Sequence, residues 1–199
     1  MADIRADPTL KNADVLCLQE TWRQRSQEVP TLPGYTCYLA GEGRGRGVAA
    51  YVRNHLVEKK PKKLLLKVEK LEGFDFFQGL KLHFEDLHIL NIYRSPDPAF
   101  IKDLPKFVEI LKRNISPQQQ TMVCGDFNYD YWKEPNHKIA VMLKGMGFNQ
   151  IVREPTTIKG NCIDHVYLKT TFCYKYRLYY PYYTDHECVC TMLKKRITM

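Results

Sequence analysis

The sequence lacks the long apolar runs of a membrane protein and the paired cysteines of a disulfide framework or zinc site. None of its hydrophobic stretches approaches the roughly 20 residues that a membrane-spanning helix needs, and no apolar signal segment opens the chain. The seven cysteines are an odd number and form no C-x-x-C pair, so we expect free thiols in a reducing, intracellular compartment. Repeats and low-complexity linkers are absent too, which favours a single domain over residues 1–199.

What the sequence does contain is an excess of positive charge. Its 30 Lys and Arg residues outnumber 22 Asp and Glu, a formal net charge of +8, which favours a polyanionic partner whose phosphates the cations neutralise. Much of this charge lies in the segment 58–70, so we expect salt-sensitive DNA binding to depend partly on Lys59, Lys60, Lys62 and Lys63. The alternative interpretation is a solvated edge strand, on which lysines prevent aggregation.

Short apolar strands that end in polar loops alternate with two helical patterns. The helices are expected at residues 98–114, where Pro105 favours a late start, and at residues 137–148, where glycines end the pattern. Strands are expected at 14–21, 47–54, 64–70, 74–84, 87–95, 121–128, 161–169 and 186–193. This order predicts a layered α/β fold with two sheets.

The glycine-rich stretch "GEGRGRG" at residues 41–47 resembles a phosphate-binding loop only superficially. Its glycines recur at every second position, and a strand rather than a helix is expected to follow, so no helix N-terminus is available for a phosphate. We therefore expect a flexible turn, from which Arg44 and Arg46 are candidates to contact a nucleic-acid backbone.

Polar residues stand at the ends of four apolar strands. Each group alone is compatible with a turn or a cap, and Thr-Asp-His is good turn material. If the strands lie together, however, three or four carboxylates converge and repel one another unless a cation neutralises them. Oxygen ligands without a Cys or His cluster favour Mg²⁺ or Mn²⁺. The four groups are Gln19–Thr21, Gly125–Asn128, Ile163–His165 and Thr184–His186.

Five short motifs, "LCLQETW", "NIYRSP", "GDFN", "IDHVYL" and "YTDH", occur in the order and rough spacing of the endonuclease/exonuclease/phosphatase superfamily. The chain resembles this superfamily over nearly its whole length. The flanking sequences "PTTIKGNCIDHVYLK" and "YYTDHECV" are most similar to endonuclease domains of mobile elements, either non-LTR retrotransposons or Helitron-type elements. The resemblance implies an α/β (α+β) four-layer sandwich, deoxyribonuclease-like, with two packed mixed β-sheets flanked by helices.

The resemblance also implies roles for the residues of the first two motifs. Glu20 would be a metal ligand, and Asp185, from the last motif, would lie close to the same metal. Tyr93 would contact the scissile phosphate, with Arg94 nearby in the substrate-binding region.

For the later motifs the implied roles concern the reacting groups. Asp126 would orient or deprotonate the attacking water, and Asn128 would hold a phosphate oxygen. His186 would act at the phosphorus, and Asp164 would fix its imidazole tautomer. Thr156, or its neighbour Thr157, would contact phosphate. Whether Asp126 or His186 is the general base stays open. Because successive strand residues face opposite ways, His165 is expected to pack in the core.

The implied function is a Mg²⁺-dependent DNA endonuclease that nicks target DNA for a mobile element. It would work in the nucleus, as part of a larger polyprotein and without membrane association. One departure supports a different interpretation: the family's first strand, with its metal-binding Asn, is expected to be missing, since only residues 1–13 precede the first predicted strand. The alternatives are therefore a catalytically impaired nucleic-acid-binding remnant, or a phosphodiesterase or phosphatase acting on other phosphoesters.

Overall fold

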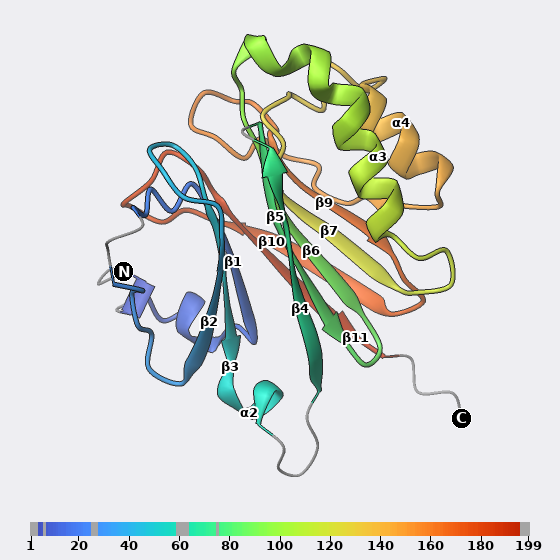
Figure 1. Cartoon of the computed structure of the whole chain (residues 1–199). Coiled ribbons are helices and arrows are strands. Elements are labelled where there is room, and N and C mark those ends of the chain that lie inside the picture. The colour runs from blue at the N-terminus through green and yellow to red at the C-terminus, as the bar shows by residue number, and fades with distance from the viewer. Residues whose placement is uncertain (1–3, 6, 25–27, 59–63, 75, 196–199) are drawn as a thin grey trace. The chain divides into compact units, whose positions relative to one another are not determined.

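The computed structural model describes residues 4–5, 7–24, 28–58, 64–74 and 76–195 (Figure 1). The chain divides into two compact units, Met1–Ser95 and Pro96–Met199, each of which is described by itself. The four lysines predicted to support DNA binding, at positions 59, 60, 62 and 63, lie outside the described residues. Among the described residues no helix is both long and apolar enough to cross a membrane. All seven cysteines are free thiols, as predicted.

The described part of the first unit contains six strands, which pair antiparallel in two sets of three. In one sheet the strand order is β1-β3-β2, and in the other β5 pairs with both β4 and β6. A 3-10 helix η1 (Leu10–Asn12) precedes the strands, and a single turn α2 (Asn54–Val57) follows β3. The strands are β1 (Val15–Gln19), β2 (Tyr35–Ala40), β3 (Val48–Arg53), β4 (Leu65–Phe74), β5 (Phe77–Phe84) and β6 (His88–Arg94).

The two sheets of the first unit pack against each other. Strand β3 contacts β5 and β6, while β2 contacts β4 and β5. The central strand β3 is buried along Val48–Val52, and Leu80 and Leu82 of β5 are fully buried. Removing this apolar surface from water is the main stabilising contribution to the unit, at about 25 cal/mol per Å².

Asn91 ties the two sheets together through polar contacts. It lies on β6 and is fully buried. Its Nδ2 donates to the backbone oxygen of Ala49 at 2.9 Å, and its Oδ1 accepts a hydrogen bond from Gln19 Nε2 at 2.5 Å. Because a buried amide is costly unless it is paired, these bonds hold the end of β1 at one place on the second sheet. The residue that follows Gln19 is Glu20.

The second unit places two helices on one face of a small sheet. Strands β7 (Thr121–Asp126), β9 (Asp164–Lys169) and β8 (Asn149–Gln150) pair antiparallel in that order. Figure 1 shows α3 (Leu104–Asn114) and α4 (Lys138–Gly145) side by side against this sheet. A long hairpin of β10 (Cys173–Tyr179) and β11 (Cys188–Lys194) completes the unit.

Helix α3 begins at Leu104, after a 3-10 segment η2 (Pro98–Asp103), so the late start that Pro105 indicates is confirmed. The helix buries Phe107 and Leu111, and α4 buries Ile139, Ala140 and Leu143. Proline at the first turn of a helix costs nothing, since its missing N–H has no intrahelical partner there.

Some boundaries differ from the prediction. The strand expected to begin at Phe74 begins at Phe77, because residues 65–74 continue as β4 and pair back on β5. Strands β2 and β10 were not expected, since their sequences "YTCYLA" and "CYKYRLY" carry few aliphatic residues. Among the described residues that precede β1 there is η1 and no strand.

Candidate active site

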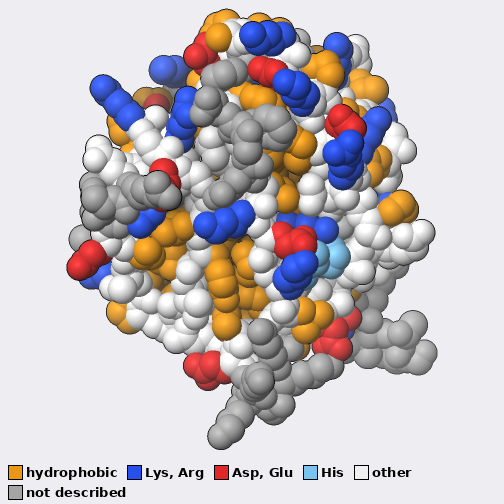
Figure 2. Space-filling model, in the orientation of Figure 1, with side chains coloured by type: hydrophobic (Ala, Val, Ile, Leu, Met, Phe, Trp, Pro, Cys, Tyr) orange, Lys and Arg blue, Asp and Glu red, His pale blue; other side chains and the backbone are white. Residues whose placement is uncertain are grey.

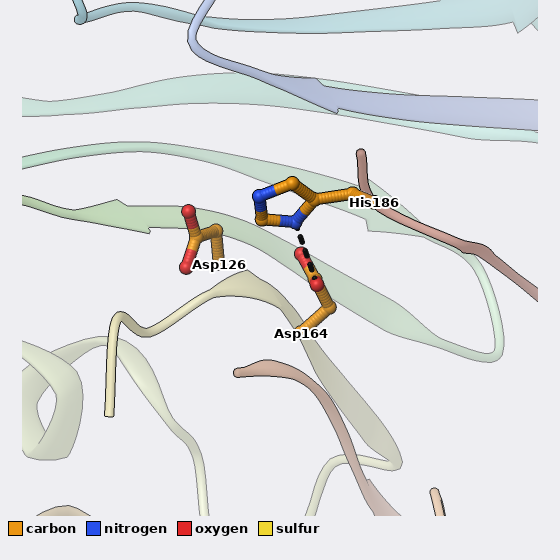
Figure 3. A group of neighbouring side chains, drawn as sticks. All are labelled: Asp126, Asp164 and His186. Carbon is orange, nitrogen blue, oxygen red and sulfur yellow. Dashed lines mark hydrogen bonds and ion pairs between the residues drawn. The ribbon is translucent and has the colours of Figure 1, made fainter. Parts of the chain in front are cut away.

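Asp126, Asp164 and His186 come together in the second unit (Figure 3). Asp126 ends β7 and Asp164 begins β9, and the antiparallel register makes them direct partners. His186 stands just before β11 and is held by a β-bridge to Thr157. One ligand atom from each of the three side chains lies within 4.8 Å of the others. Three of the four predicted groups therefore meet here, through two carboxylates and one imidazole.

His186 and Asp164 form a hydrogen-bonded ion pair. The Nδ1–H of the imidazole donates to Asp164 Oδ2 at 2.8 Å. This bond raises the pKa of His186 to about 9, against the opposing effect of burial, and the charges of Asp164, Asp126 and Asp185 add to the rise. The ring is therefore an imidazolium near neutral pH. In Figure 3 its other nitrogen points to the side of Asp126.

Asn128 holds the Asp126 carboxylate from both sides. Its backbone N–H donates to Oδ1 at 2.8 Å, and its side-chain Nδ2 donates to Oδ2 at 3.0 Å. Asp126 is only 5% exposed, so these bonds fix a nearly buried carboxylate in one orientation. Asn128 has a φ of 49°, a left-handed conformation that asparagine adopts more readily than most residues. The turn interpretation of "GDFN" is therefore confirmed, and the catalytic interpretation stays a prediction.

Thr156 supports Asp164 from within the core. Its side chain is fully buried, and its Oγ1 accepts the backbone N–H groups of Asp164 at 3.0 Å and Ile163 at 3.2 Å. Its carbonyl accepts the N–H of Glu187 at 2.8 Å, so one residue anchors both the start of β9 and the segment after His186. The phosphate contact expected for Thr156 stays a prediction, whereas its observed contacts are those of a positioning residue.

We expect Thr156→Val to lower both stability and turnover. The variant removes the hydroxyl that accepts two partly buried N–H groups, and an unpaired group that is fully buried costs about 1–3 kcal/mol. Urea unfolding and single-turnover kinetics on the same samples measure the two effects. Thr121→Val is the matched control, because Thr121 is equally buried on β7 and its hydroxyl donates to the Gln119 carbonyl at 3.1 Å. An unchanged turnover for Thr156→Val would contradict the positioning role.

In the first unit, Glu20 is held at the end of β1 by two side chains. Its Oε1 accepts a hydrogen bond from the hydroxyl of the buried Tyr93 at 3.0 Å, and its Oε2 accepts one from Trp22 Nε1 at 3.1 Å. The φ of Glu20 is 48°, an uncommon value for a residue other than glycine. Carboxylates that bind metals are usually held by hydrogen bonds from neighbouring side chains, as Glu20 is here, and its role as a metal ligand stays a prediction.

The glycine-rich loop 41–47 runs alongside the residues that follow Glu20. Hydrogen bonds join Thr21 N to Gly47 O, Trp22 N to Arg46 O and Gly43 N to Arg23 O. A β-carbon on Gly47 would come within 2.4 Å of Thr21 Oγ1, and the φ of Gly47 is +92°. A strand, β3, follows the loop, so the argument against a phosphate-binding loop is confirmed. The alternating glycines instead serve this close backbone pairing.

The sequence of the chain matches the model of a known protein family. The family model described as "Endonuclease/Exonuclease/phosphatase family" matches residues 1–186. The chain belongs to this family. The predicted superfamily is thereby confirmed, and with it hydrolysis of phosphoesters as the general chemistry of the group. No curated protein sequence matches the chain.

Solved structures with low sequence identity share the fold. The endonuclease domain of TRAS1, a telomere-specific non-LTR retrotransposon, is 15% identical with a TM-score of 0.68, over 98% of this chain and 91% of that one. An AP endonuclease from Archaeoglobus fulgidus is 15% identical with a TM-score of 0.64, over 93% and 90%. The human Nocturnin catalytic domain is 15% identical with a TM-score of 0.60, over 97% and 85%. These likenesses confirm the predicted α+β, deoxyribonuclease-like fold.

The family motifs also imply roles for Asp185 and Arg94, which are not members of the Asp126–Asp164–His186 group. Asp185 is exposed and its backbone oxygen accepts the N–H of Ile158 at 3.1 Å, but its carboxylate is not part of the close group of three. Arg94 is half-buried and bonds the Ser95 carbonyl at 3.5 Å. Their roles, and a metal shared by Glu20 and Asp185, stay predictions.

His165 is a core residue, as predicted. Its ring is fully buried and stacks on Phe127 with centroids 5.0 Å apart, and its Nε2 bonds the Cys162 carbonyl at 2.9 Å. Burial lowers the pKa of His165 to about 4, so this histidine stays neutral. His165 is therefore neutral near pH 7 and His186 is positively charged, because their environments differ.

The donor atoms fit a hard divalent cation. In the second unit Asp126 and Asp164 supply carboxylate oxygens, which are the ligands that Mg²⁺ and Mn²⁺ prefer. His186 is a weaker candidate ligand than the carboxylates, because an imidazolium has no nitrogen lone pair to offer a cation and the pKa of His186 is raised to about 9. Sequence reasoning identified these carboxylates but missed Trp22 and the supporting role of Thr156.

Proposed function

We propose that this protein is a divalent-metal-dependent endonuclease that hydrolyses phosphodiester bonds in DNA and nicks target DNA for a mobile element. The observation that carries the proposal is the Asp126–Asp164–His186 cluster, in which a fixed carboxylate and an imidazolium lie within reach of one reacting group. Such a pair can remove a proton on one side and stabilise negative charge on the other, as in-line attack of water on a phosphodiester requires.

In this proposal each residue has one task. Asp126, oriented by Asn128, takes the proton from the attacking water. His186 is an imidazolium with a pKa raised to about 9 by Asp164, so it suits charge stabilisation at the phosphoryl group better than proton abstraction. Its Nε2–H would donate to a non-bridging oxygen while Asp164 holds the ring. This assignment favours Asp126 as the general base.

The cofactor in the proposal is Mg²⁺, or Mn²⁺ in its place. When bound, the cation neutralises charge on the phosphate oxygens and aids the leaving 3′ oxygen. Glu20 would be its ligand, held by Tyr93 and Trp22. We propose that Asp185 lies close to the metal and that Arg94 and Asn128 contact the substrate.

DNA as the substrate is supported by charge and by the nature of the relatives. The net charge is +8. Figure 2 shows Lys and Arg side chains spread over one face among acidic and apolar ones, and such cations can neutralise backbone phosphates. The TRAS1 domain is a retrotransposon endonuclease, and by analogy the chain would act in the nucleus as part of a larger polyprotein.

A panel of substrates separates the proposal from its alternatives. Supercoiled plasmid, a small phosphodiester such as bis-p-nitrophenyl phosphate, and a phosphomonoester are incubated with the protein in Mg²⁺. The proposal predicts nicking of plasmid and little turnover of the other two. Faster hydrolysis of the small esters would favour a phosphatase-like enzyme, and DNA binding without turnover of any substrate would favour a catalytically impaired remnant.

The raised pKa of His186 predicts pH-dependent stability. Its pKa is about 9 in the folded protein against an ordinary value of 6.5, so the ion pair with Asp164 contributes stability that is fully present below pH 6.5 and lost as pH rises through 9. The difference in melting temperature between the wild type and His186→Gln should shrink steadily over that range. A difference that does not change between pH 6 and pH 10 would show that the imidazolium is not what stabilises the pair.

A further inference from the structure

The turn after β1 presents a tryptophan beside the candidate metal ligand. Trp22 is 50% exposed, and its Nε1–H donates to Glu20 Oε2 at 3.1 Å. Its φ is 53°, a left-handed conformation that bulky residues rarely adopt. Strained backbone of this kind is found at ligand-binding sites, where the surrounding structure enforces it.

The glycine-rich loop enforces this conformation and leaves the ring accessible. Trp22 N–H donates to the Arg46 carbonyl at 3.1 Å. A β-carbon on Gly45, whose φ is +64°, would lie 4.0 Å from the indole Cζ2, so the loop backbone lies close to the ring edge. The Arg44 guanidinium lies over the ring at 5.7 Å from its centroid, near the outer limit of about 6 Å for a cation–π contact. Trp22 as a whole is 50% exposed.

On the basis of the proposed function, we propose that Trp22 and Arg44 form a stacking site for a nucleobase lifted out of the helix next to the phosphodiester to be cut. An indole face accepts any base, and a guanidinium adds positive charge and a second planar surface. A base inside an intact duplex offers no free face. The site therefore favours DNA with an unpaired or easily unstacked base close to the nick.

The hydrogen bond from Trp22 to Glu20 couples base stacking to the candidate metal ligand. Trp22→Phe keeps an aromatic face but removes the N–H donor, whereas Trp22→Ala removes both. We expect the Phe variant to keep its affinity for DNA with an unpaired base and to need more Mg²⁺ for half-maximal activity. We expect the Ala variant to bind this DNA about 5- to 150-fold more weakly, as loss of one base–aromatic stack predicts.

Tryptophan fluorescence tests the stacking without requiring turnover. The chain contains two tryptophans, and Trp132 is also 50% exposed, so it is a matched reference. Trp132→Phe leaves Trp22 as the single emitter, and Trp22→Phe leaves Trp132. Each variant is titrated in EDTA with two duplexes of the same length and sequence, one fully paired and one with a single unpaired base.

The proposal predicts that Trp22 emission is quenched more strongly by the duplex with the unpaired base, while Trp132 emission does not distinguish the two. Arg44→Ala should weaken the Trp22 response without abolishing the folded state, which its melting temperature checks. Equal responses of Trp22 to both duplexes, or no response, would overturn the stacking site. Because the titration needs no metal, an inactive protein with the predicted quenching would contradict only the proposed endonuclease function.

Discussion

His186→Ala is expected to lower the rate of DNA nicking by orders of magnitude while leaving DNA binding nearly unchanged. The imidazolium would contact the phosphate most strongly as negative charge develops, so its removal affects turnover more than affinity. Asp164→Asn should lose a large part of the same activity, because Asp164 holds the ring at 2.8 Å and raises its pKa. Single-turnover nicking by the wild type and the variants measures these losses.

The double variant distinguishes a catalytic unit from two independent residues. If Asp164 acts only through His186, then Asp164→Asn combined with His186→Ala should be little slower than His186→Ala alone. Glu109→Gln is a suitable control, since Glu109 is an exposed carboxylate on α3 that pairs with Arg113, and it should retain the full rate. Strictly additive losses would mean that the observed ion pair has no joint role in the reaction.

Asp126→Asn is expected to be the second variant with a very large loss. General base catalysis contributes typically about 10²- to 10⁴-fold, and an amide cannot accept the proton. The change also replaces one acceptor oxygen with an NH₂ group, which would face the donor groups of Asn128. The loss should appear in single-turnover rates at saturating Mg²⁺, with DNA affinity retained.

A further variant shows whether the loss in Asp126→Asn comes from the missing base or from the disturbed hydrogen bonds with Asn128. Asn128→Ala removes the side-chain bond to Asp126 Oδ2 but leaves the base itself in place. It should therefore be slower than the wild type and clearly faster than Asp126→Asn. If Asp126→Asn retained a rate within a few-fold of the wild type, Asp126 would not be the base, and the assignment of His186 as imidazolium would need revision.

The strands that position the site could be predicted because they are short apolar runs ending in polar residues. Strands β1 and β7 are of this kind, whereas in β9 the site residue Asp164 stands at the start of the apolar run. Strands β2 and β10 could not be found in this way, because tyrosines and polar residues give them a weak apolar signal and their pairing depends on partners far along the chain. Pairing of that kind is a tertiary effect that overrides local propensity.

The same limit applies to the site. The motifs predicted Asp126, Asp164 and His186, but the charge state of His186 depends on a hydrogen bond and on burial that only the folded chain supplies. The contribution of Trp22 depends on positive φ angles and on the pairing of its turn with loop 41–47. The alternating glycines were a visible signal, although their function could not be understood without the segment that they contact.

Plasmid nicking by the unmodified protein, with and without a divalent cation, tests the proposed metal-dependent endonuclease activity most directly. Purified protein is incubated with supercoiled plasmid in Mg²⁺, in Mn²⁺ and in EDTA, beside His186→Ala as the inactive reference, and the open circular form is quantified over time. A metal-dependent endonuclease nicks the plasmid in both metals and not in EDTA, and His186→Ala nicks it almost not at all. Nicking in EDTA, or equal rates for the wild type and His186→Ala, would contradict the proposed activity.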